Sequence, residues 1–386
     1  MNFFSQLAGS VGYLGLSIAA FMFVLIIVVF FHEFGHFWVG RRCGIKVDAF
    51  SIGFGPELFS FTDRKGTRWR FALLPLGGYV KFHGDANGAS TPDAAALSAM
   101  PADTYKQTFA AASVWKRAAT VVAGPAANFL LAIVIFTGAF YINGRAVLPP
   151  RIEKVEAASA AEAAGLKAGD LVLSIDGRAI DSFEQLQRLV MSSAGVPMKL
   201  EIERAGGLVS LAVTPATREI KTPWRSYTVG AIGVRAPSSQ NDLRIDHPGF
   251  VDAVSLGAGE TWSWVERTGS FVAGIFAGRE SAGQVSGPIG IAAVSGEMAK
   301  LGFGPLMMLV AILSISVGLI NLVPIPLLDG GHLMYFAIEA LRGRPLSEKA
   351  QDFGFKIGLA LVGALMLFAT SNDQINLAAK WTGHAG

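Results

Sequence analysis

The sequence predicts a polytopic α-helical membrane protein with four transmembrane helices, a membrane-associated β-hairpin and an inserted extracytoplasmic α+β domain. Hydrophobic residues make up 52% of the 386 residues and charged residues only 16%, whereas soluble proteins average about 25% charged residues. Residues 11–31 contain no charged side chain, as expected for a membrane-spanning helix. Alternating polar and apolar residues within 147–217 indicate strands of a domain outside the membrane.

Charge and cysteine content exclude two classes of site. The formal net charge is only +3 and the basic residues are segregated along the chain, so we expect no nucleic-acid partner. Cys43 is the single cysteine, which rules out an internal disulfide and a cysteine-based structural zinc site. The first basic residue is Arg41. Because a signal peptide needs an earlier basic region, the first apolar stretch is expected to be retained as an anchor.

Four apolar segments are expected to cross the membrane, at residues 11–39, 118–142, 304–328 and 355–370. Basic residues cluster after the first segment, before the second, and between the third and fourth. Because basic loops remain in the cytoplasm, both termini are expected on the extracytoplasmic side. The predicted divisions are the first transmembrane helix (1–41), a cytoplasmic-side hairpin and loop (42–117), the second helix (118–143), the outer domain (147–217), a linker with an interfacial amphipathic helix (218–302), the third transmembrane segment (303–341), a cytoplasmic loop with the fourth helix (342–371), and an outer tail (372–386).

The first apolar segment contains the motif His-Glu-Phe-Gly-His at residues 32–36. An acidic side chain at the middle of a membrane helix costs about 2.5 kcal/mol or more on insertion scales, so a compensating partner is expected. His32 and His36 lie one turn apart on the same helix face. Two imidazoles so placed can hold Zn²⁺, with Glu33 beside them as general base. The alternative is a chance occurrence of the pattern in an ordinary helix, which the apolar setting disfavours.

A catalytic zinc site needs a third protein ligand, and the third apolar segment supplies a candidate. Two prolines and two glycines interrupt the segment between Asn321 and His332. Such irregular backbone persists at membrane depth only where protein or a water-filled cavity shelters it. Asp329 lies in this break and is the predicted third ligand, with His332 as the rival. An Asp-Gly turn that merely ends a helix is the structural alternative.

Two further segments have distinctive patterns. Residues 50–82 are predicted to form a hairpin with a charged turn at residues 63–66, and Gly53, Phe54 and Gly55 lie near its start. Residues 250–278 mix aromatic and charged side chains and are too polar to span the membrane. They are expected either to lie in the membrane interface or to pack as a helix on the outer domain.

Residues 147–217 resemble a PDZ domain of the bacterial protease type. Residues 169–177 read as an alternating strand closed by an Asp-Gly turn, Ser182 is placed to cap a helix, and residues 199–213 read as a hairpin that turns at Gly206-Gly207. The resemblance implies capture of a peptide C-terminus by strand addition between residues 152–155 and the helix at 182–193. The alternative is a steric plug that binds no ligand.

Taken together, these motifs resemble the site-2 protease family of intramembrane zinc metalloproteases, and within it the bacterial branch of the RseP and MmpA type. The resemblance is carried by the motif at 32–36 together with Asn321, Pro324 and Asp329-Gly330. Further matching segments extend it over almost the whole chain: Gly53-Phe54-Gly55, Gly124-Pro125 with Asn128, and Ser286-Gly287-Pro288-Ile289-Gly290. The chain departs from the best-known RseP pattern because it contains one PDZ domain rather than two in tandem.

The resemblance implies a multi-pass zinc endopeptidase of the bacterial inner membrane that acts in regulated intramembrane proteolysis. Its substrates would be single-pass proteins within the lipid bilayer, already cut once outside: anti-sigma factors, polarity proteins or signal-peptide remnants. The hairpin would be a membrane re-entrant β element, and the substrate-binding residues would be Asn321, Gly53, Phe54 and Gly55. Asn128 suits either a role toward substrate or a role in helix packing.

Two functions of other classes remain as alternatives. A membrane PDZ scaffold with a structural metal site would not need Glu33. A metal transporter would use His32, His36 and Asp329 as a transit site, but the chain lacks the internal repeat that many transporters carry. Both are therefore disfavoured against the protease.

Overall fold

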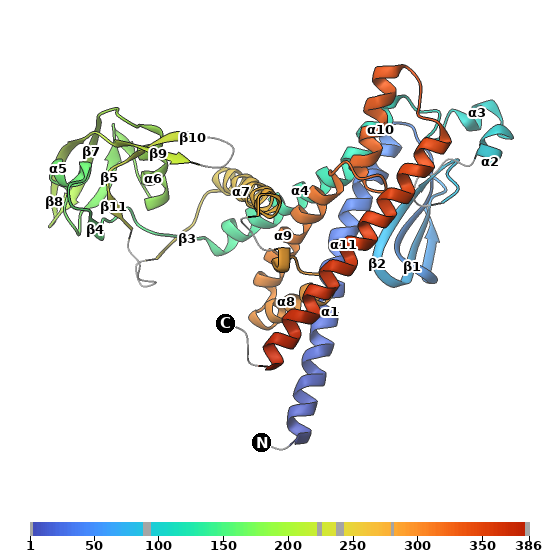
Figure 1. The fold of residues 1–386 in the computed structure, drawn as a ribbon, viewed down its shortest axis with the longest axis horizontal. Coiled ribbons are helices and arrows are strands. Elements are labelled where there is room, and N and C mark those ends of the chain that lie inside the picture. The colour runs from blue at the N-terminus through green and yellow to red at the C-terminus, as the bar shows by residue number, and fades with distance from the viewer. Residues whose placement is uncertain (1–2, 88–93, 222–225, 237–242, 279–281, 383–386) are drawn as a thin grey trace. The chain divides into compact units, whose positions relative to one another are not determined.

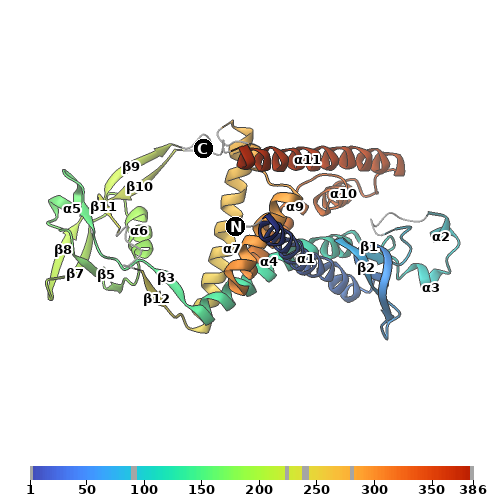
Figure 2. The same cartoon turned by 90° about the horizontal axis from the view of Figure 1, so that it is seen from below.

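The computed structural model describes residues 3–87, 94–221, 226–236, 243–278 and 282–382. The chain divides into two compact units. Unit 1 comprises Met1–Ala139 and Phe250–Gly386, and unit 2 comprises Phe140–Gly249. Unit 1 is dominated by long helices and unit 2 by short strands (Figures 1 and 2).

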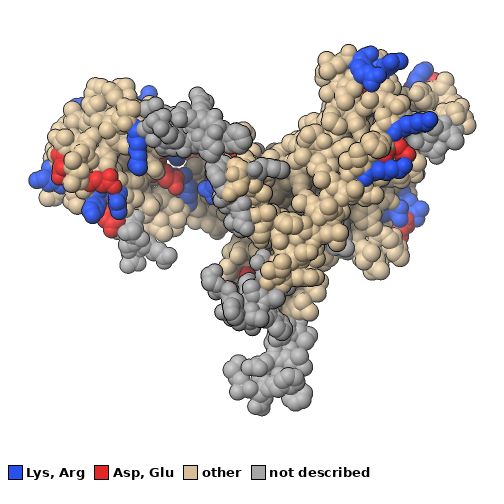
Figure 3. All heavy atoms as spheres, viewed as in Figure 1, with Lys and Arg blue, Asp and Glu red and all other residues tan. Residues whose placement is uncertain are grey.

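Among the residues that the structure describes, four helices are long and apolar enough to cross a membrane, as the sequence predicts. They are α1 (Phe3–Arg42), α4 (Val114–Asn143), α9 (Phe303–Asn321) and α11 (Glu348–Thr382). The fourth is much longer than the expected 355–370, and its candidate membrane span is Lys349–Ile375. In Figure 3 the blue and red side chains of unit 1 gather toward the end where α10 meets α11 and beside the hairpin, and tan surface dominates the middle of that face.

The predicted break after the third apolar helix is confirmed. Helix α9 ends at Asn321, and helix α10 (Asp329–Arg342) begins only after an irregular segment. Gly330 and Gly331 pack against this segment so closely that an added Cβ would lie 2.3 Å from the Val323 carbonyl oxygen and 2.4 Å from that of Ile325. The glycines therefore let the broken backbone fold back onto the start of α10.

The predicted hairpin is also present, in a more elaborate form. Strands β1 (Val47–Thr62) and β2 (Arg68–Phe82) pair antiparallel around the charged turn, with several register shifts. Each strand bends once, so that residues 47–52 pair with 68–71 on one side and with 78–82 on the other. Gly53 and Gly55, both with φ of +89°, form the bend in β1. The result is a curled sheet of four short segments in the spatial order 57–62, 68–72, 47–52 and 78–82.

Segment 78–82 is an edge of this sheet among the residues that the structure describes. Aromatic packing fixes the sheet against α1, since the Trp69 ring lies 5.0 Å from that of Phe37 and 4.4 Å from that of Phe50. Large apolar side chains farther along the sheet stay exposed: Leu58, Phe59, Phe61, Leu73 and Leu74.

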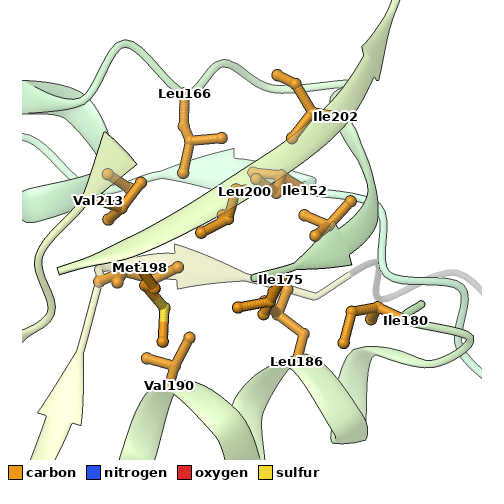
Figure 4. Packing of buried hydrophobic residues seen from close by; sticks show 13 residues of the cluster. Ile152, Leu166, Ile175, Ile180, Leu186, Val190, Met198, Leu200, Ile202 and Val213 are labelled. Carbon is orange, nitrogen blue, oxygen red and sulfur yellow. The ribbon is translucent and has the colours of Figure 1, made fainter. Parts of the chain in front are cut away.

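Unit 2 is built around a four-stranded antiparallel sheet in the order β6-β5-β7-β8. Its strands are β5 (Leu171–Ile175), β6 (Arg178–Ala179), β7 (Met198–Arg204) and β8 (Gly207–Val213). Helix α5 (Ala160–Ala163) adds Ala161 to the core. Helix α6 (Phe183–Ser192) adds Leu186 and Val190 (Figure 4). The side chain of Ser182 accepts a hydrogen bond from the Gln185 amide, which confirms the predicted helix cap.

The turns of this unit follow the sequence with one shift. Asp176 and Gly177 both have positive φ, as a two-residue hairpin turn requires. In the next hairpin the turn residues are Ala205 and Gly206 rather than the predicted Gly206 and Gly207, because Gly207 already pairs with Arg204.

Strands continue beyond residue 217, where the sequence suggested only a linker. Strand β9 (Ala216–Lys221) pairs with β10 (Ser226–Ala231), and β11 (Val234–Arg235) pairs with β4 (Lys154–Val155). Strand β12 (Arg244–Asp246) pairs with β3 (Arg145–Val147). Unit 2 therefore begins and ends with strands that lie side by side.

The segment from 250 onward forms the predicted helix, α7 (Phe250–Phe276). A 3-10 turn, η2 (Ala282–Gln284), and an unpredicted helix, α8 (Pro288–Leu301), follow it. The buried Asp373 carboxylate of α11 accepts hydrogen bonds from the backbone amides of Gly287, Ile289 and Gly290 at 2.9–3.0 Å. Two short helices, α2 (Ala94–Ser98) and α3 (Ala102–Tyr105), lie between the hairpin and α4.

Candidate metal centre

The structure brings together the three residues predicted as metal ligands. The Nε2 atoms of His32 and His36 on α1 lie 3.3 Å apart. Oδ2 of Asp329, at the start of α10, lies 3.2 Å from His32 Nε2 and 3.5 Å from His36 Nε2. The break after α9 is what places the first residue of α10 against α1.

These distances fit a tetrahedral metal. Ligand atoms that each lie about 2.0–2.2 Å from a tetrahedral zinc ion are separated from one another by roughly 3.3–3.6 Å. The three donor atoms form a triangle of this size, and both imidazoles are buried. Two neutral imidazoles and one carboxylate match the donor set of catalytic zinc sites, which leave a fourth position open.

Helix α4 contacts both imidazoles at their Nδ1 atoms, on the ring edge away from Asp329. Nδ1 of His36 lies 2.9 Å from the Thr120 carbonyl oxygen, to which it can only donate. Nδ1 of His32 lies 3.3 Å from the side-chain amide of Asn128. The first contact leaves the lone pair of His36 on Nε2, which is the atom that faces Asp329.

A cavity of about 200 Å³ opens beside the three candidate ligands. Glu33 lines it and packs against Gly78 of β2, where an added Cβ would lie 2.9 Å from the Glu33 Cγ atom. The sheet side of the cavity is formed by the edge segment of β2. Its lining includes His32, Glu33, His36, Gly78, Tyr79, Val80, Phe82, Phe109, Val121, Asn321, Leu327, Asp329 and His332.

Asn321 and His332, the other polar candidates, also line the cavity. The Asn321 amide nitrogen donates to the Val317 carbonyl oxygen of its own helix at 3.0 Å. His332 does not join the cluster of possible ligand atoms, which among the described residues consists of His32, His36 and Asp329. This geometry favours Asp329 over His332 as the third ligand.

Gly53, Phe54 and Gly55 are not among the residues that line the cavity. They form the bend of β1, where the Phe54 ring stacks on that of Tyr79 with centroids 6.2 Å apart. Tyr79 itself lines the cavity. Phe54 therefore contacts this part of the wall through Tyr79, and Gly53 and Gly55 flank it in the bend.

Sequence reasoning did not assign roles to three residues that shape the site: Gly78, Thr120 and Gly124. The pair Gly77-Gly78 was a signal, since two adjacent glycines in a strand indicate a close approach of another group. Thr120 acts through its backbone carbonyl, which no sequence pattern reveals. Gly124 lies so close to the His36 ring that an added Cβ would be 2.2 Å from Nε2.

Comparisons with known proteins identify metalloproteases as relatives of this chain. A model of peptidase family M50 matches residues 20–365. A Rhizobium meliloti protein named "Putative zinc metalloprotease" is 49% identical over 358 residues, which cover 92% of this chain and 96% of that protein. The metalloprotease MmpA of Caulobacter vibrioides is 38% identical over 387 residues, covering 94% of this chain and 96% of MmpA.

A third relative is the regulator of sigma-E protease RseP of Salmonella typhimurium. It is 31% identical over 451 residues, which cover 92% of this chain and 98% of that protein. The alignment is longer than the 386 residues of this chain. RseP therefore carries additional sequence within the aligned region.

Proposed function

The chain belongs to peptidase family M50 and is a zinc metalloprotease, and from this premise we propose that it cleaves the transmembrane segments of single-pass membrane proteins. His32, His36 and Asp329 would hold the zinc ion, and Glu33 would be the general base. The observation that carries the proposal is the triangle of ligand atoms beside a cavity lined by Glu33, formed among helices apolar enough to span a membrane.

The chain's own residues supply the proton transfer. Bound zinc would supply Lewis-acid activation of a water molecule and of the scissile carbonyl. The Glu33 carboxylate accepts the proton of that water and passes it to the leaving amine. Gly78 leaves room for the Glu33 side chain, since an added Cβ would meet its Cγ at 2.9 Å. No covalent intermediate is required.

The substrate presents a separate physical problem. A helical substrate must unwind before its peptide bond can reach the site, and each unpaired backbone group in lipid costs several kcal/mol. The edge segment 78–82 offers backbone hydrogen-bonding groups at the cavity wall. A substrate strand added to this edge would pair the groups that unwinding exposes.

We assign the predicted substrate-binding residues to parts of this path. Asn321 lines the cavity and would bond the substrate backbone. Gly53, Phe54 and Gly55 would act at the bend of the sheet, with the half-exposed Phe54 ring contacting substrate side chains beside Tyr79. The exposed apolar side chains of the sheet suit a re-entrant element in the bilayer.

Orientation and specificity extend the same proposal. We place both termini and unit 2 on the outer side of the bacterial inner membrane, on the basis of the basic loops. Unit 2 would act as a PDZ domain that binds a peptide C-terminus or excludes substrates with bulky outer domains. Within unit 2, strand β10 packs beside α6, where an added Cβ at Gly230 would lie 2.1 Å from the Val190 carbonyl oxygen.

Exclusion of bulky outer domains would favour substrates already shortened outside, such as anti-sigma factors, polarity proteins or signal-peptide remnants.

The test is cleavage of a model single-pass substrate by the purified protein in detergent, wild type beside Glu33→Gln, with bound zinc quantified in both. We expect Glu33→Gln to retain zinc and to lose cleavage by about 10²–10⁴-fold, because only the proton acceptor is removed. Chelation of zinc should abolish wild-type cleavage, and added zinc should restore it. Equal cleavage by both proteins would move the activity elsewhere, and zinc without any wild-type cleavage would favour a scaffold with a structural metal.

A further inference from the structure

Helix α4 presents three positions one turn apart to the imidazoles of α1: Thr120, Gly124 and Asn128. We propose that Asn128 is a positioning residue whose side-chain carbonyl accepts a hydrogen bond from Nδ1–H of His32. This bond would hold the His32 ring with the lone pair of Nε2 directed at the metal. The inference rests on the metal centre of the proposed function and concerns how that centre is held.

Only one direction of the hydrogen bond between Asn128 and His32 is compatible with metal binding: His32 must donate and Asn128 must accept. The Asn128 amide lies 3.3 Å from His32 Nδ1, and Nε2 of the same ring faces His36 and Asp329. A neutral imidazole carries its proton on one nitrogen only. If the amide donated to Nδ1, the proton would lie on Nε2 and would block the ligand position.

The amide can supply the required acceptor. Oδ1 of Asn128 is buried and makes no hydrogen bond within the described part of the chain, although a buried carbonyl oxygen without a partner destabilises a fold. The oxygen and nitrogen ends of a side-chain amide have nearly the same shape. A half-turn of the amide places Oδ1 against His32 Nδ1–H, which pairs these two groups, and moves the NH2 group to the position that Oδ1 held.

The second histidine uses the same arrangement on the same helix. His36 Nδ1 lies 2.9 Å from the Thr120 carbonyl oxygen, two turns before Asn128 on α4. Ligating histidines commonly donate their second ring proton to an oxygen, which fixes the tautomer and the ring orientation. Asn128 would thus do for His32 what the Thr120 carbonyl does for His36.

The backbone of Asn128 is held independently of its amide. The residue is fully buried, and its carbonyl oxygen accepts a hydrogen bond from the Ser314 hydroxyl of α9 at 2.9 Å. Gly318, one turn further along α9, also packs against the Asn128 side chain, with an added Cβ 3.4 Å from the Asn128 Cβ. Ser314 therefore offers a control in which the packing of α4 on α9 is changed and the amide remains.

The experiment measures zinc affinity of the full-length protein in detergent by competition with a chelator, without using activity. We expect Asn128→Leu to weaken zinc binding by about 10–100-fold, as loss of such partners does elsewhere. Asn128→Asp keeps an oxygen acceptor and should bind zinc at least as tightly as wild type. Ser314→Ala should remain within about threefold of wild type. Cobalt in place of zinc should give a shifted visible spectrum in Asn128→Leu and an unshifted one in Ser314→Ala.

Wild-type zinc affinity in Asn128→Leu would overturn the proposal, and so would equal weakening in Asn128→Leu and Asn128→Asp. The latter result would give Asn128 a packing role only. If Asn128→Leu does not yield a monodisperse protein, Asn128→Ala replaces it with the same expected loss, and Asn128→Asp still decides. Failure of Glu33→Gln to abolish cleavage would leave this result unaffected, since zinc affinity is measured without substrate.

Discussion

At the scale of single residues, the candidate metal centre depends on glycines that let two helices approach each other. An added Cβ at Gly35 of α1 would lie 2.1 Å from the Ala123 carbonyl oxygen of α4. An added Cβ at Gly124 of α4 would lie 2.2 Å from Nε2 of His36. Small residues at helix interfaces in membranes permit this close packing. Here the close packing brings the α4 backbone within hydrogen-bonding reach of His36.

This packing predicts a specific defect in Gly124→Ala. The added methyl group overlaps the ligand atom itself, so the His36 ring must turn and its bond to the Thr120 carbonyl must break. We expect zinc affinity to fall by about tenfold or more, as loss of a ligand's orienting partner does. The control is Gly138→Ala on the same helix, where an added Cβ has no neighbour within 4 Å. Wild-type zinc affinity in Gly124→Ala, measured by chelator competition, would contradict the close approach.

At the scale of elements, a buried carboxylate joins the ends of two strands in unit 2. Asp170, just before β5, accepts hydrogen bonds from Arg204 of β7 at 2.7–2.8 Å and from the Lys167 amide at 2.8 Å. Burial raises the pKa of Asp170. The hydrogen bonds and charge of Arg204, together with the hydrogen bond from the Lys167 amide, lower this pKa by more than burial raises it. The net effect holds the pKa of Asp170 below its usual value of 3.8.

The lowered pKa of Asp170 gives the stability of unit 2 a defined pH dependence. A carboxyl group whose pKa is lower in the folded state stabilises the fold above its unfolded pKa, and this contribution is lost as the pH falls through the folded value. We expect wild type to protect the β5 and β7 amides from hydrogen exchange better than Asp170→Asn at pH 7. The difference should shrink below about pH 4. Exchange rates corrected for intrinsic pH effects would measure it. Glu203→Gln, which removes an exposed carboxylate from β7, should show no such trend.

The elements differ in how far the sequence alone determines them. Local patterns were sufficient for the apolar helices, for the charged turn of the hairpin and for the Ser182 cap, because spacing and capping are properties of neighbouring residues. The prediction of a helix break before Asp329 also rested on local prolines and glycines. Together with the motif at 32–36, this break predicted the three candidate ligands that the structure brings together.

Other elements depend on partners distant in the chain and could not be predicted. Strands β4 and β11 have two residues each and exist only because they pair across about 80 residues of chain. Helix α8 is capped by Asp373, which lies on the last helix. The bends of β1 and β2 create the edge segment 78–82, which a simple hairpin pattern does not contain. The hydrogen bond from His36 to Thr120 uses a backbone carbonyl, which every residue type carries, so no sequence pattern could predict it.

At the scale of the whole molecule, the chain enters and leaves unit 2 at one place. Arg145 of β3 pairs with Asp246 of β12, so their Cα atoms are separated by about 4.5–5.5 Å. Gly144 lies against His247, where an added Cβ would be 3.0 Å from the imidazole ring. A short glycine linker can therefore replace residues 145–246 without pulling on the helices that precede and follow them.

This excision tests whether unit 2 excludes bulky substrates. We expect the shortened protein to keep its zinc and to cleave a single-pass substrate that lacks an outer domain to within about threefold of wild type, because the metal centre lies wholly in unit 1. It should also gain cleavage of the same transmembrane segment fused to a folded outer domain. Removal of 147–217 alone is the contrasting variant, since it takes β4, the four-stranded sheet and most of the core but leaves β11 without its partner, and it should be unstable. If the excised protein is stable, retains zinc and still rejects the bulky substrate, selection by size must reside in unit 1, and unit 2 must have another role.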